Sequence, residues 1–279
     1  MKKYLVIGNP IDHSLSPKLH NYWIKKNNID AIYEKRLVEE KDLKNLCDEI
    51  REGKIQGFNV TVPFKEKINK YLDGFTENAS KTRAVNTVYR KLEGEECIIM
   101  GDNTDVYGFQ KSCSLSYVSR RGAKALIIGA GGASKAVICA LDNMGIKKFA
   151  IINRTKEKAQ KLIEDLKIQN VDLYEWCKDE GRLSKPDIVV NCTSLGLKSG
   201  DTIPLEFLKY KKKFFTKKII FFDLIYNPQE TNFLKTAKEI GQLSINGKMM
   251  FIYQAQKSFK KWHNILPEVN DEVIDLLND

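Results

Sequence analysis

Two ionisable side chains in the first half of the sequence could move a proton between them and a substrate. Lys65 follows an apolar run that Pro63 interrupts, and Asp105 lies in the polar segment 101–108. Reduction of a ketone needs a proton donor for the forming alkoxide, which a lysine ammonium can supply, and a neighbouring carboxylate can orient that lysine. Taken alone, each residue is more often half of a surface ion pair. The residues themselves therefore leave both interpretations open.

The turn at 129–134 could cradle a phosphate. It lies between an apolar run typical of a strand, 125–128, and a helical pattern over 134–144. A first glycine permits the tight turn, and the next two let the backbone approach a pyrophosphate, whose charge is met by N–H groups at the helix N-terminus. Glycine also starts plain helices, but the order strand, turn, helix favours a dinucleotide site. The predicted cofactor contacts are Gly129, Ala130, Gly131, Gly132 and Ala133, with the small Ser134 at the third glycine position.

The residues after the next predicted strand select the cofactor. NAD sites usually end this strand with Asp or Glu, which binds the ribose 2′-hydroxyl, whereas a nearby arginine accommodates the 2′-phosphate of NADP. Here no carboxylate occurs before Glu157. The Arg154 guanidinium can bind a phosphate through two hydrogen bonds. The sequence therefore predicts NADP rather than NAD, held by Asn153, Arg154, Thr155, Lys156 and Lys158.

Strand and helix patterns alternate along the chain, and they must position these residues. In the first part, strands are predicted over 4–7, 31–38 and 58–62, a hairpin over 85–89 and 97–100, and helices from Ser16 as N-cap and over 40–51. In the second part, strands are predicted over 125–128, 149–152, 188–190 and 219–222, with helices over 134–144 and 155–166. Strands separated by helices indicate parallel sheets with right-handed crossovers.

These patterns predict an α/β protein with two domains. Residues 1–108 form an N-terminal α/β domain that has a mainly parallel sheet and carries the substrate and catalytic residues. Residues 109–246 form a Rossmann-type domain that binds NADP. The segment 247–279, which contains an apolar helical stretch over 249–262, is predicted to pack back onto the first domain.

Length and composition exclude several classes of protein. The chain has 279 residues, of which 42% are hydrophobic and 29% charged, as expected for about two globular domains. No apolar run approaches the roughly 18 residues of a membrane span, and the run at 4–7 is too short for a signal peptide. Six cysteines without a C-x-x-C spacing and only three histidines predict a metal-free, cytoplasmic protein with reduced thiols.

The positive charge balance favours anionic partners. Lysine and arginine number 46 against 36 acidic residues, a net charge of +10. Nucleic acid, a phosphorylated cofactor and a carboxylate substrate all satisfy this balance. The strip 209–218 mixes lysines with aromatics, but it precedes an apolar strand pattern and is expected to be a solvated connection. We therefore expect a small-molecule substrate, and neither nucleic acid nor a membrane as partner.

Several motifs, in their order along the chain, resemble the shikimate dehydrogenase family. They are Ser14-Leu15-Ser16-Pro17, Asn59 to Lys65, Ala84-Val85-Asn86-Thr87, Asn103-Thr104-Asp105, the Gly129 turn, Asn153-Arg154-Thr155 and Gln254-Ala255. The resemblance covers nearly the whole chain. It implies NADP-linked reduction of 3-dehydroshikimate to shikimate, a step of chorismate and aromatic amino-acid biosynthesis.

The resemblance also implies roles for individual residues. Lys65 matches the acid/base of the family, and Asp105 its partner on the ring hydroxyls of the substrate. The rest of the implied substrate shell consists of Ser14, Ser16, Thr61, Asn86, Tyr226 and Gln254. Further implied cofactor contacts are Glu77, Leu224 and Gly247. Leu224 stands where the family often has methionine against the nicotinamide, and Leu195 stands where it often has a smaller residue.

Two rival functions stay open on the sequence. A relative that also uses quinate would need room for one more hydroxyl beside the substrate carboxylate, near Ser14 and Tyr226. A non-catalytic NADP-binding regulator would not need the pair of Lys65 and Asp105. The state of assembly, monomer or homodimer, is not fixed by the sequence.

Overall fold

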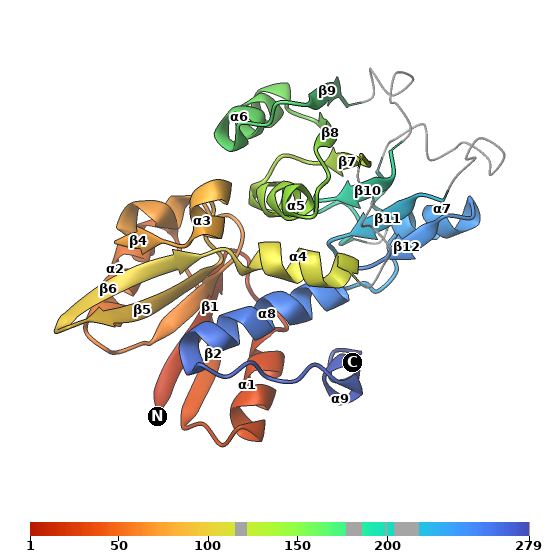
Figure 1. Cartoon of the computed structure of the whole chain (residues 1–279). Coiled ribbons are helices and arrows are strands. Elements are labelled where there is room, and N and C mark those ends of the chain that lie inside the picture. Colours follow the sequence, from red (N-terminus) through yellow and green to blue (C-terminus); the bar gives the residue numbers. More distant parts are fainter. Residues whose placement is uncertain (115–121, 177–185, 199, 204–217, 279) are drawn as a thin grey trace. The chain divides into compact units, whose positions relative to one another are not determined.

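The computed structural model describes residues 1–114, 122–176, 186–198, 200–203 and 218–278, apart from the side chain of Ser114. The chain divides into two compact units, Met1–Gly108 with Ile252–Asp279, and Phe109–Phe251. Each unit contains a six-stranded sheet (Figure 1). In the part of the chain that is described, no helix combines the length and the apolar character that a membrane crossing requires. The predicted basic strip lies outside the described residues over 209–217.

The sheet of the first unit has the strand order β2-β1-β3-β5-β6-β4. Its strands are β1 (Lys2–Gly8), β2 (Ala31–Leu37), β3 (Gly57–Val60), β4 (Gly74–Phe75), β5 (Thr87–Glu93) and β6 (Glu96–Asp102). β1 pairs in parallel with β2 and β3, and β4 pairs in parallel with β6. β5 runs antiparallel to both β3 and β6, as the predicted hairpin requires. The described helices that lie wholly or partly in this unit are α1 (Ser16–Lys26), α2 (Leu43–Arg51), α3 (Glu77–Thr82), α4 (Thr104–Ser114), α8 (Lys248–His263) and α9 (Asp271–Asp275), with 3₁₀ turns at Glu40–Asp42 and Lys67–Tyr71.

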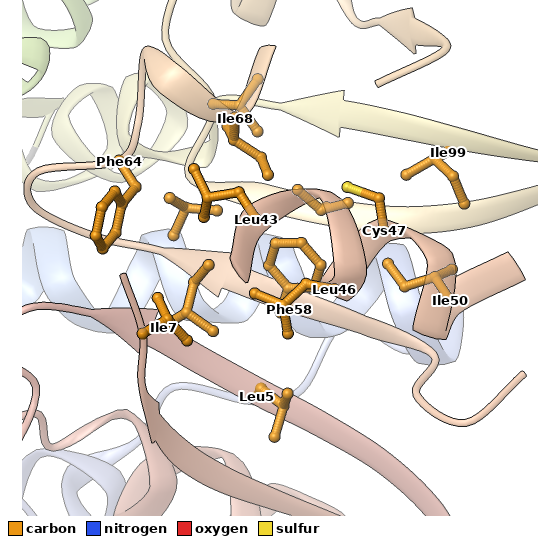
Figure 2. Packing of buried hydrophobic residues seen from close by; sticks show 14 of the residues in the cluster. Leu5, Ile7, Leu43, Leu46, Cys47, Ile50, Phe58, Phe64, Ile68 and Ile99 are labelled. Carbon is orange, nitrogen blue, oxygen red and sulfur yellow. The ribbon is translucent and has the colours of Figure 1, made fainter. Parts of the chain in front are cut away.

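The two faces of this sheet have different cores, because side chains alternate along each strand. On one face, Leu5 and Ile7 of β1 pack with Phe58 of β3 and with Leu46 and Ile50 of α2, all at most 1% exposed (Figure 2). α2 has apolar residues at helical spacing, so it presents one apolar stripe to the sheet. This apolar core fixes the ends of the strands, from which polar side chains project.

The other face of the sheet is covered by an aromatic cluster. Its centre is His20 of α1, which stacks on Tyr33 of β2 with ring centroids 4.2 Å apart. Phe259 and Trp262 come from α8 (Lys248–His263), and the Trp262 indole N–H donates to the carbonyl of Val88 at 3.1 Å. From Ile252 onward α8 belongs to the first unit. The C-terminal residues thus group with the first unit from Ile252 onward, whereas the segment predicted to return begins at residue 247.

The second unit has a Rossmann-type sheet, which confirms the predicted fold class. Its strand order is β12-β11-β10-β7-β8-β9, and all neighbours are parallel. The strands are β7 (Lys124–Ile128), β8 (Lys148–Asn153), β9 (Val171–Glu175), β10 (Ile188–Asn191), β11 (Ile220–Asp223) and β12 (Leu243–Ile245). The helices described within it are α5 (Gly132–Asn143), α6 (Lys156–Leu166) and α7 (Asn232–Glu239). The order reverses between β7 and β10, where such sheets bind dinucleotides beyond the carboxyl ends of their strands.

Local details of the prediction were wrong in two places. Ser16 is the first residue of α1 and Leu15 is its N-cap, with no capping bond from that side chain. The Ser14 hydroxyl instead accepts a hydrogen bond from the Ser16 N–H at 3.3 Å, so the serine two residues earlier takes over the capping role. The predicted strand 58–62 ends at Val60, because the chain turns at Val62 and Pro63.

Candidate active site

Lys65 and Asp105 meet in the first unit. The Lys65 ammonium donates to Oδ2 of Asp105 at 2.6 Å, and the side chains are 17% and 9% exposed. Lys65 lies in the turn after β3, and Asp105 lies in the first turn of α4, where the helix dipole favours a carboxylate. The pair is enclosed but still reachable, which is what proton transfer to a bound small molecule requires.

Two amide side chains complete the surroundings of this pair. Asn86 donates to Oδ1 of Asp105 at 2.8 Å and to the hydroxyl of Thr104 at 3.0 Å. The carbonyl of the Gln254 side chain, on α8, lies 3.4 Å from the same amide nitrogen. Asp105 thus accepts from Lys65 and Asn86 on different oxygens. The structure brings together four of the predicted site residues, Lys65, Asn86, Asp105 and Gln254.

A layer of buried hydroxyl groups beneath these residues was not predicted. The Ser258 hydroxyl, fully buried on α8, lies 2.8 Å from that of Thr87 and 3.1 Å from that of Thr104. Asn59 donates to Ser258 at 3.1 Å and accepts from the Tyr33 phenol at 2.7 Å. Burial raises the pKa of the Tyr33 phenol well above its usual value, so this group remains a donor. The network fixes the strand ends that carry Asn86 and Asp105.

The other predicted substrate residues of this unit lie on its loops and on α1. Ser14 and Thr61 are partly exposed, and Ser16 is 7% exposed. Ser16 forms a side-chain hydrogen bond with Tyr33, which opposes the effect of burial on the pKa of that phenol. The methyl of Thr61 lies against Gly8, where an added Cβ would approach it to 2.4 Å. Thr61 follows the carboxyl end of β3, as Lys65 does, and its methyl lies beside Gly8 at the end of β1, whereas Ser16 begins α1.

Glu77, predicted as a cofactor contact, begins α3 in the first unit. Thr76 caps this helix by accepting from the Ala79 N–H. The Glu77 side chain is 79% exposed and pairs with Lys81 at 2.6 Å, which lowers the pKa of its carboxyl. The structure places Glu77 at the surface and gives it a local partner.

The glycine turn of the second unit connects β7 to α5. Gly129 has φ +104°, and a Cβ there would lie 2.9 Å from the Thr193 methyl, so only glycine suits this position. At Gly131 an added Cβ would meet nothing within 4 Å, which leaves the backbone open to a ligand. The Ser134 hydroxyl accepts from the Gly131 N–H at 3.2 Å and donates to the Gly129 carbonyl at 2.9 Å. Ser134 is therefore small enough for close packing, and its hydroxyl also links Gly131 to Gly129 within the turn.

The residues after β8 form a polar, basic end of the same sheet. Asn153 donates to the Thr155 carbonyl at 2.7 Å and so shapes the turn into α6. Arg154, Lys156 and Lys158 are exposed. Within the described residues Arg154 makes no ion pair, so its guanidinium is available to an anion at the end of β8.

Leu224 and Gly247 lie together at the other half of the sheet. A Cβ at Gly247 would stand 2.1 Å from the Leu224 carbonyl oxygen, so glycine is required for this close approach. The Gly247 N–H donates to the Ile225 carbonyl at 3.0 Å. Tyr226 stacks on Phe251, with ring centroids 4.5 Å apart. These contacts join the loops after β11 and β12. In sheets of this type, one half of a bound dinucleotide lies on this side of the switch point.

A lysine–carboxylate pair on one unit and a dinucleotide-type turn on a parallel sheet of order 3-2-1-4-5-6 on the other define a class of protein, the dinucleotide-linked oxidoreductases. Comparison with family models narrows this class. Residues 6–88 match the shikimate dehydrogenase substrate binding domain, and residues 114–232 match shikimate / quinate 5-dehydrogenase.

Individual relatives resemble the chain along its whole length. A shikimate dehydrogenase (NADP(+)) of Pelagibacter ubique is 47% identical over 277 residues, which cover 99% of this chain and 99% of that protein. A shikimate dehydrogenase (NADP(+)) of Methanococcus aeolicus is 39% identical over 279 residues, which cover 98% of this chain and 96% of that protein.

Solved structures agree. Shikimate dehydrogenase from Aquifex aeolicus has a TM-score of 0.86 and 35% identity, over 100% of this chain and 98% of that one. The Thermus thermophilus shikimate 5-dehydrogenase in complex with NADP(H) and shikimate has a TM-score of 0.82 and 29% identity. The match covers 99% of this chain and 98% of that one. The chain belongs to the shikimate dehydrogenase family, which confirms the resemblance drawn from the motifs.

Proposed function

We propose that this chain is an NADP-dependent oxidoreductase that interconverts 3-dehydroshikimate and shikimate. The observation that carries the proposal is the contact of 2.6 Å between Lys65 and Asp105, with Asn86 on the second oxygen of the same carboxylate. The first unit would bind the substrate and the second unit NADP. The family and the names of its relatives support this assignment.

Lys65 is proposed as the proton donor. When bound, NADPH supplies a hydride to the C3 carbonyl carbon of 3-dehydroshikimate, and the carbonyl oxygen then needs a proton. The Lys65 ammonium has a proton to give, and Asp105 holds the amine within reach. In the reverse direction the same amine accepts the proton of the shikimate hydroxyl.

The substrate shell is proposed from groups that suit a small ring with hydroxyls and a carboxylate. Asn86, Gln254 and Asp105 form one cluster that can bind ring hydroxyls. Ser14, Ser16 and Thr61 supply further hydroxyl groups, and Tyr226 is proposed for the substrate carboxylate. A site that depends on such hydrogen bonds discriminates strongly against analogues that lack a hydroxyl, because its polar groups are then left unpaired.

The residues of the second unit fit NADP. The open position at Gly131 lets the backbone approach a pyrophosphate, and the N-terminus of α5 favours its charge. Arg154, with Lys156 and Lys158 beside it, supplies the positive charge that a 2′-phosphate requires. We propose Ala130, Gly132, Ala133, Asn153, Thr155, Leu224, Gly247 and Glu77 as the remaining contacts. A cytoplasmic location and a monomer or homodimer remain expectations from the sequence.

The decay of NADPH absorbance in the presence of 3-dehydroshikimate tests the proposal. We expect turnover with NADPH and much slower turnover when NADH replaces it. The same assay with 3-dehydroquinate shows whether the site also accepts a ring with one more hydroxyl. NADPH binding without turnover on either ketone would contradict the proposed activity and favour a non-catalytic NADP-binding regulator.

A further inference from the structure

A buried carboxyl group lies at the end of β11, and the proposed mechanism does not use it. Asp223 is 0% exposed. Its Oδ1 accepts from the side-chain amide of Asn191 at 3.0 Å and from the Ile225 N–H at 3.1 Å. Its Oδ2 accepts from the Thr231 hydroxyl at 2.6 Å. Three donors from three different segments thus converge on one side chain.

The surroundings of this carboxyl group are neutral as far as the structure describes the chain. Among the described residues Asp223 makes no ion pair, and burial raises its pKa from 3.8 to about 6, although the bonds from Thr231, Ile225 and Asn191 oppose that shift. Burying such a group costs free energy that a neutral apolar residue would avoid. What Asp223 offers in return is geometric, since both of its oxygens accept hydrogen bonds.

The partners of Asp223 hold the loop after β10. Asn191, also fully buried, accepts from the Thr193 N–H at 3.0 Å and from its hydroxyl at 2.7 Å, and donates to the Leu195 carbonyl at 3.1 Å. The Thr193 methyl closes on Gly129, where a Cβ would lie 2.9 Å away. The bond from Asn191 to Asp223 therefore connects the loop that contacts the glycine turn to the end of β11.

The same carboxyl group holds the loop after β11. The Ile225 N–H donates to Asp223, while the Ile225 carbonyl accepts from the Gly247 N–H at 3.0 Å. Leu224, between Asp223 and Ile225, is the residue whose carbonyl packs against Gly247. Both proposed nicotinamide contacts are thus linked to Asp223: Leu224 is the next residue in the chain, and Gly247 is hydrogen-bonded to Ile225, which donates to Asp223.

We propose that Asp223 is a positioning residue for the half of the cofactor site that takes the nicotinamide ring, acting by joining the loops after β10 and β11. This inference rests on the proposed function, because it assumes that NADP binds across the switch point of this sheet. The 2′-phosphate end of the cofactor would be held elsewhere, at Arg154 after β8. In the strand order, β10 and β7 separate β11 from β8.

The test compares the whole cofactor with its adenosine half. Dissociation constants for NADPH and for 2′,5′-ADP are measured on the wild-type chain, Asp223→Ala and Asp223→Asn. We expect Asp223→Ala to weaken NADPH by about 10-fold or more, because it leaves two loops without their common acceptor, and to leave 2′,5′-ADP within about 2-fold. Asp223→Asn retains one acceptor oxygen and should restore most of the NADPH affinity.

A milder pair of variants keeps the test decisive if Asp223→Ala does not fold. Thr231→Val removes one of the three hydrogen bonds, and Thr231→Ser retains the hydroxyl and serves as its matched control. NADPH should weaken a few-fold in the valine variant and remain unchanged in the serine variant. Arg154→Gln is the opposite control, since it should weaken 2′,5′-ADP as well as NADPH.

Two outcomes would overturn the inference. Equal losses for NADPH and 2′,5′-ADP would show that Asp223 only stabilises the unit, and unchanged NADPH affinity in both Asp223→Ala and Thr231→Val would show that the loops need no such link. If the wild-type chain bound neither probe, the proposed function itself would fail and the inference with it, a result distinct from either of the first two.

Discussion

The two units present polar groups to small molecules in opposite ways. In the first unit the candidate site is assembled from side chains that hold one another, with Lys65, Asn86 and Asp105 in contact and largely buried. In the second unit the candidate site consists of a backbone turn and of exposed cations such as Arg154. The proposed substrate would therefore meet side chains that are hydrogen-bonded to one another, whereas the proposed cofactor would meet a backbone turn and exposed positive charge.

The chemistry of the two ligands explains this difference. A hydride and proton transfer needs its donor placed accurately, and prearranged hydrogen bonds avoid the cost of ordering it during the reaction. A phosphate offers several equivalent oxygens and a high charge, so flexible cations and backbone N–H groups suffice to bind it. On the proposed function, preorganisation is thus concentrated where bonds would change and is least where phosphates would bind.

The largest effect is expected from a substitution in the candidate site of the first unit. Lys65→Ala removes the proposed proton donor and should lower kcat by about 10²- to 10⁴-fold, the usual contribution of general acid–base catalysis. Steady-state kinetics with NADPH and 3-dehydroshikimate measure it. The control is Lys67→Ala, which removes an exposed lysine paired with Glu40 and should leave kcat unchanged. A rise in KM without loss of kcat would make Lys65 a binding residue instead.

On the cofactor side, Arg154→Gln should abolish the preference for the phosphorylated cofactor. Loss of a charge-assisted bond to the 2′-phosphate is expected to raise the KM for NADPH by about 10- to 100-fold while changing that for NADH little. Lys161→Gln is a suitable control, because this exposed lysine of α6 pairs with Asp165. Equal changes for both cofactors would contradict a phosphate contact at Arg154.

Acid should loosen the first unit through its aromatic cluster. Burial, aided by the charge of His263, lowers the pKa of His20 from 6.5 to about 3. The unfolded chain therefore binds more protons between these values, so stability is complete above pH 6.5 and falls below it. The free energy of unfolding should drop by about 2 kcal/mol from pH 7 to pH 5 through His20 alone.

Urea unfolding monitored by tryptophan fluorescence measures this loss, because Trp23 and Trp262 contact His20. A Trp176→Phe background removes the tryptophan of the second unit from the signal. In that background His20→Phe should remove about half of the pH dependence between pH 5 and 6.5, because burial also lowers the pKa of His263 in the same cluster to about 4. The same slope with and without His20 would show that another group titrates there.

The smallest expected effect is that of salt. Exposed charges are screened, so the KM for NADPH should rise a few-fold between roughly 0.05 and 0.5 M salt. The KM for shikimate should change less, because its proposed partners are enclosed and the pair of Lys65 and Asp105 carries no net charge. Arg154→Gln should reduce the salt dependence for NADPH. If shikimate were the more salt-sensitive ligand, the contrast between the units would be wrong.

Functional features that depend on residues adjacent in the chain could be predicted from the sequence. The glycine turn at 129–134 and the absence of a carboxylate before Glu157 were visible, because phosphate and ribose binding use consecutive backbone and side-chain groups. Most of the central strands followed from apolar runs. The short strands β9 and β12 were not predicted, because their pairing with neighbours decides them rather than their own composition.

Only the tertiary structure decided which distant groups meet. Lys65 contacts a carboxylate 40 residues further along, and Asn86 lies beside Gln254, 168 residues away. The motifs suggested Asp105 as the partner of Lys65, but the contacts among these groups arise from the packing of strand ends and of α8. The role of Asp223 was hidden for the same reason. A carboxylate after a strand indicates a position at the sheet edge. Its donors Ile225 and Thr231 follow within eight residues, but Asn191, 32 residues earlier, is brought to it only by the pairing of β10 with β11.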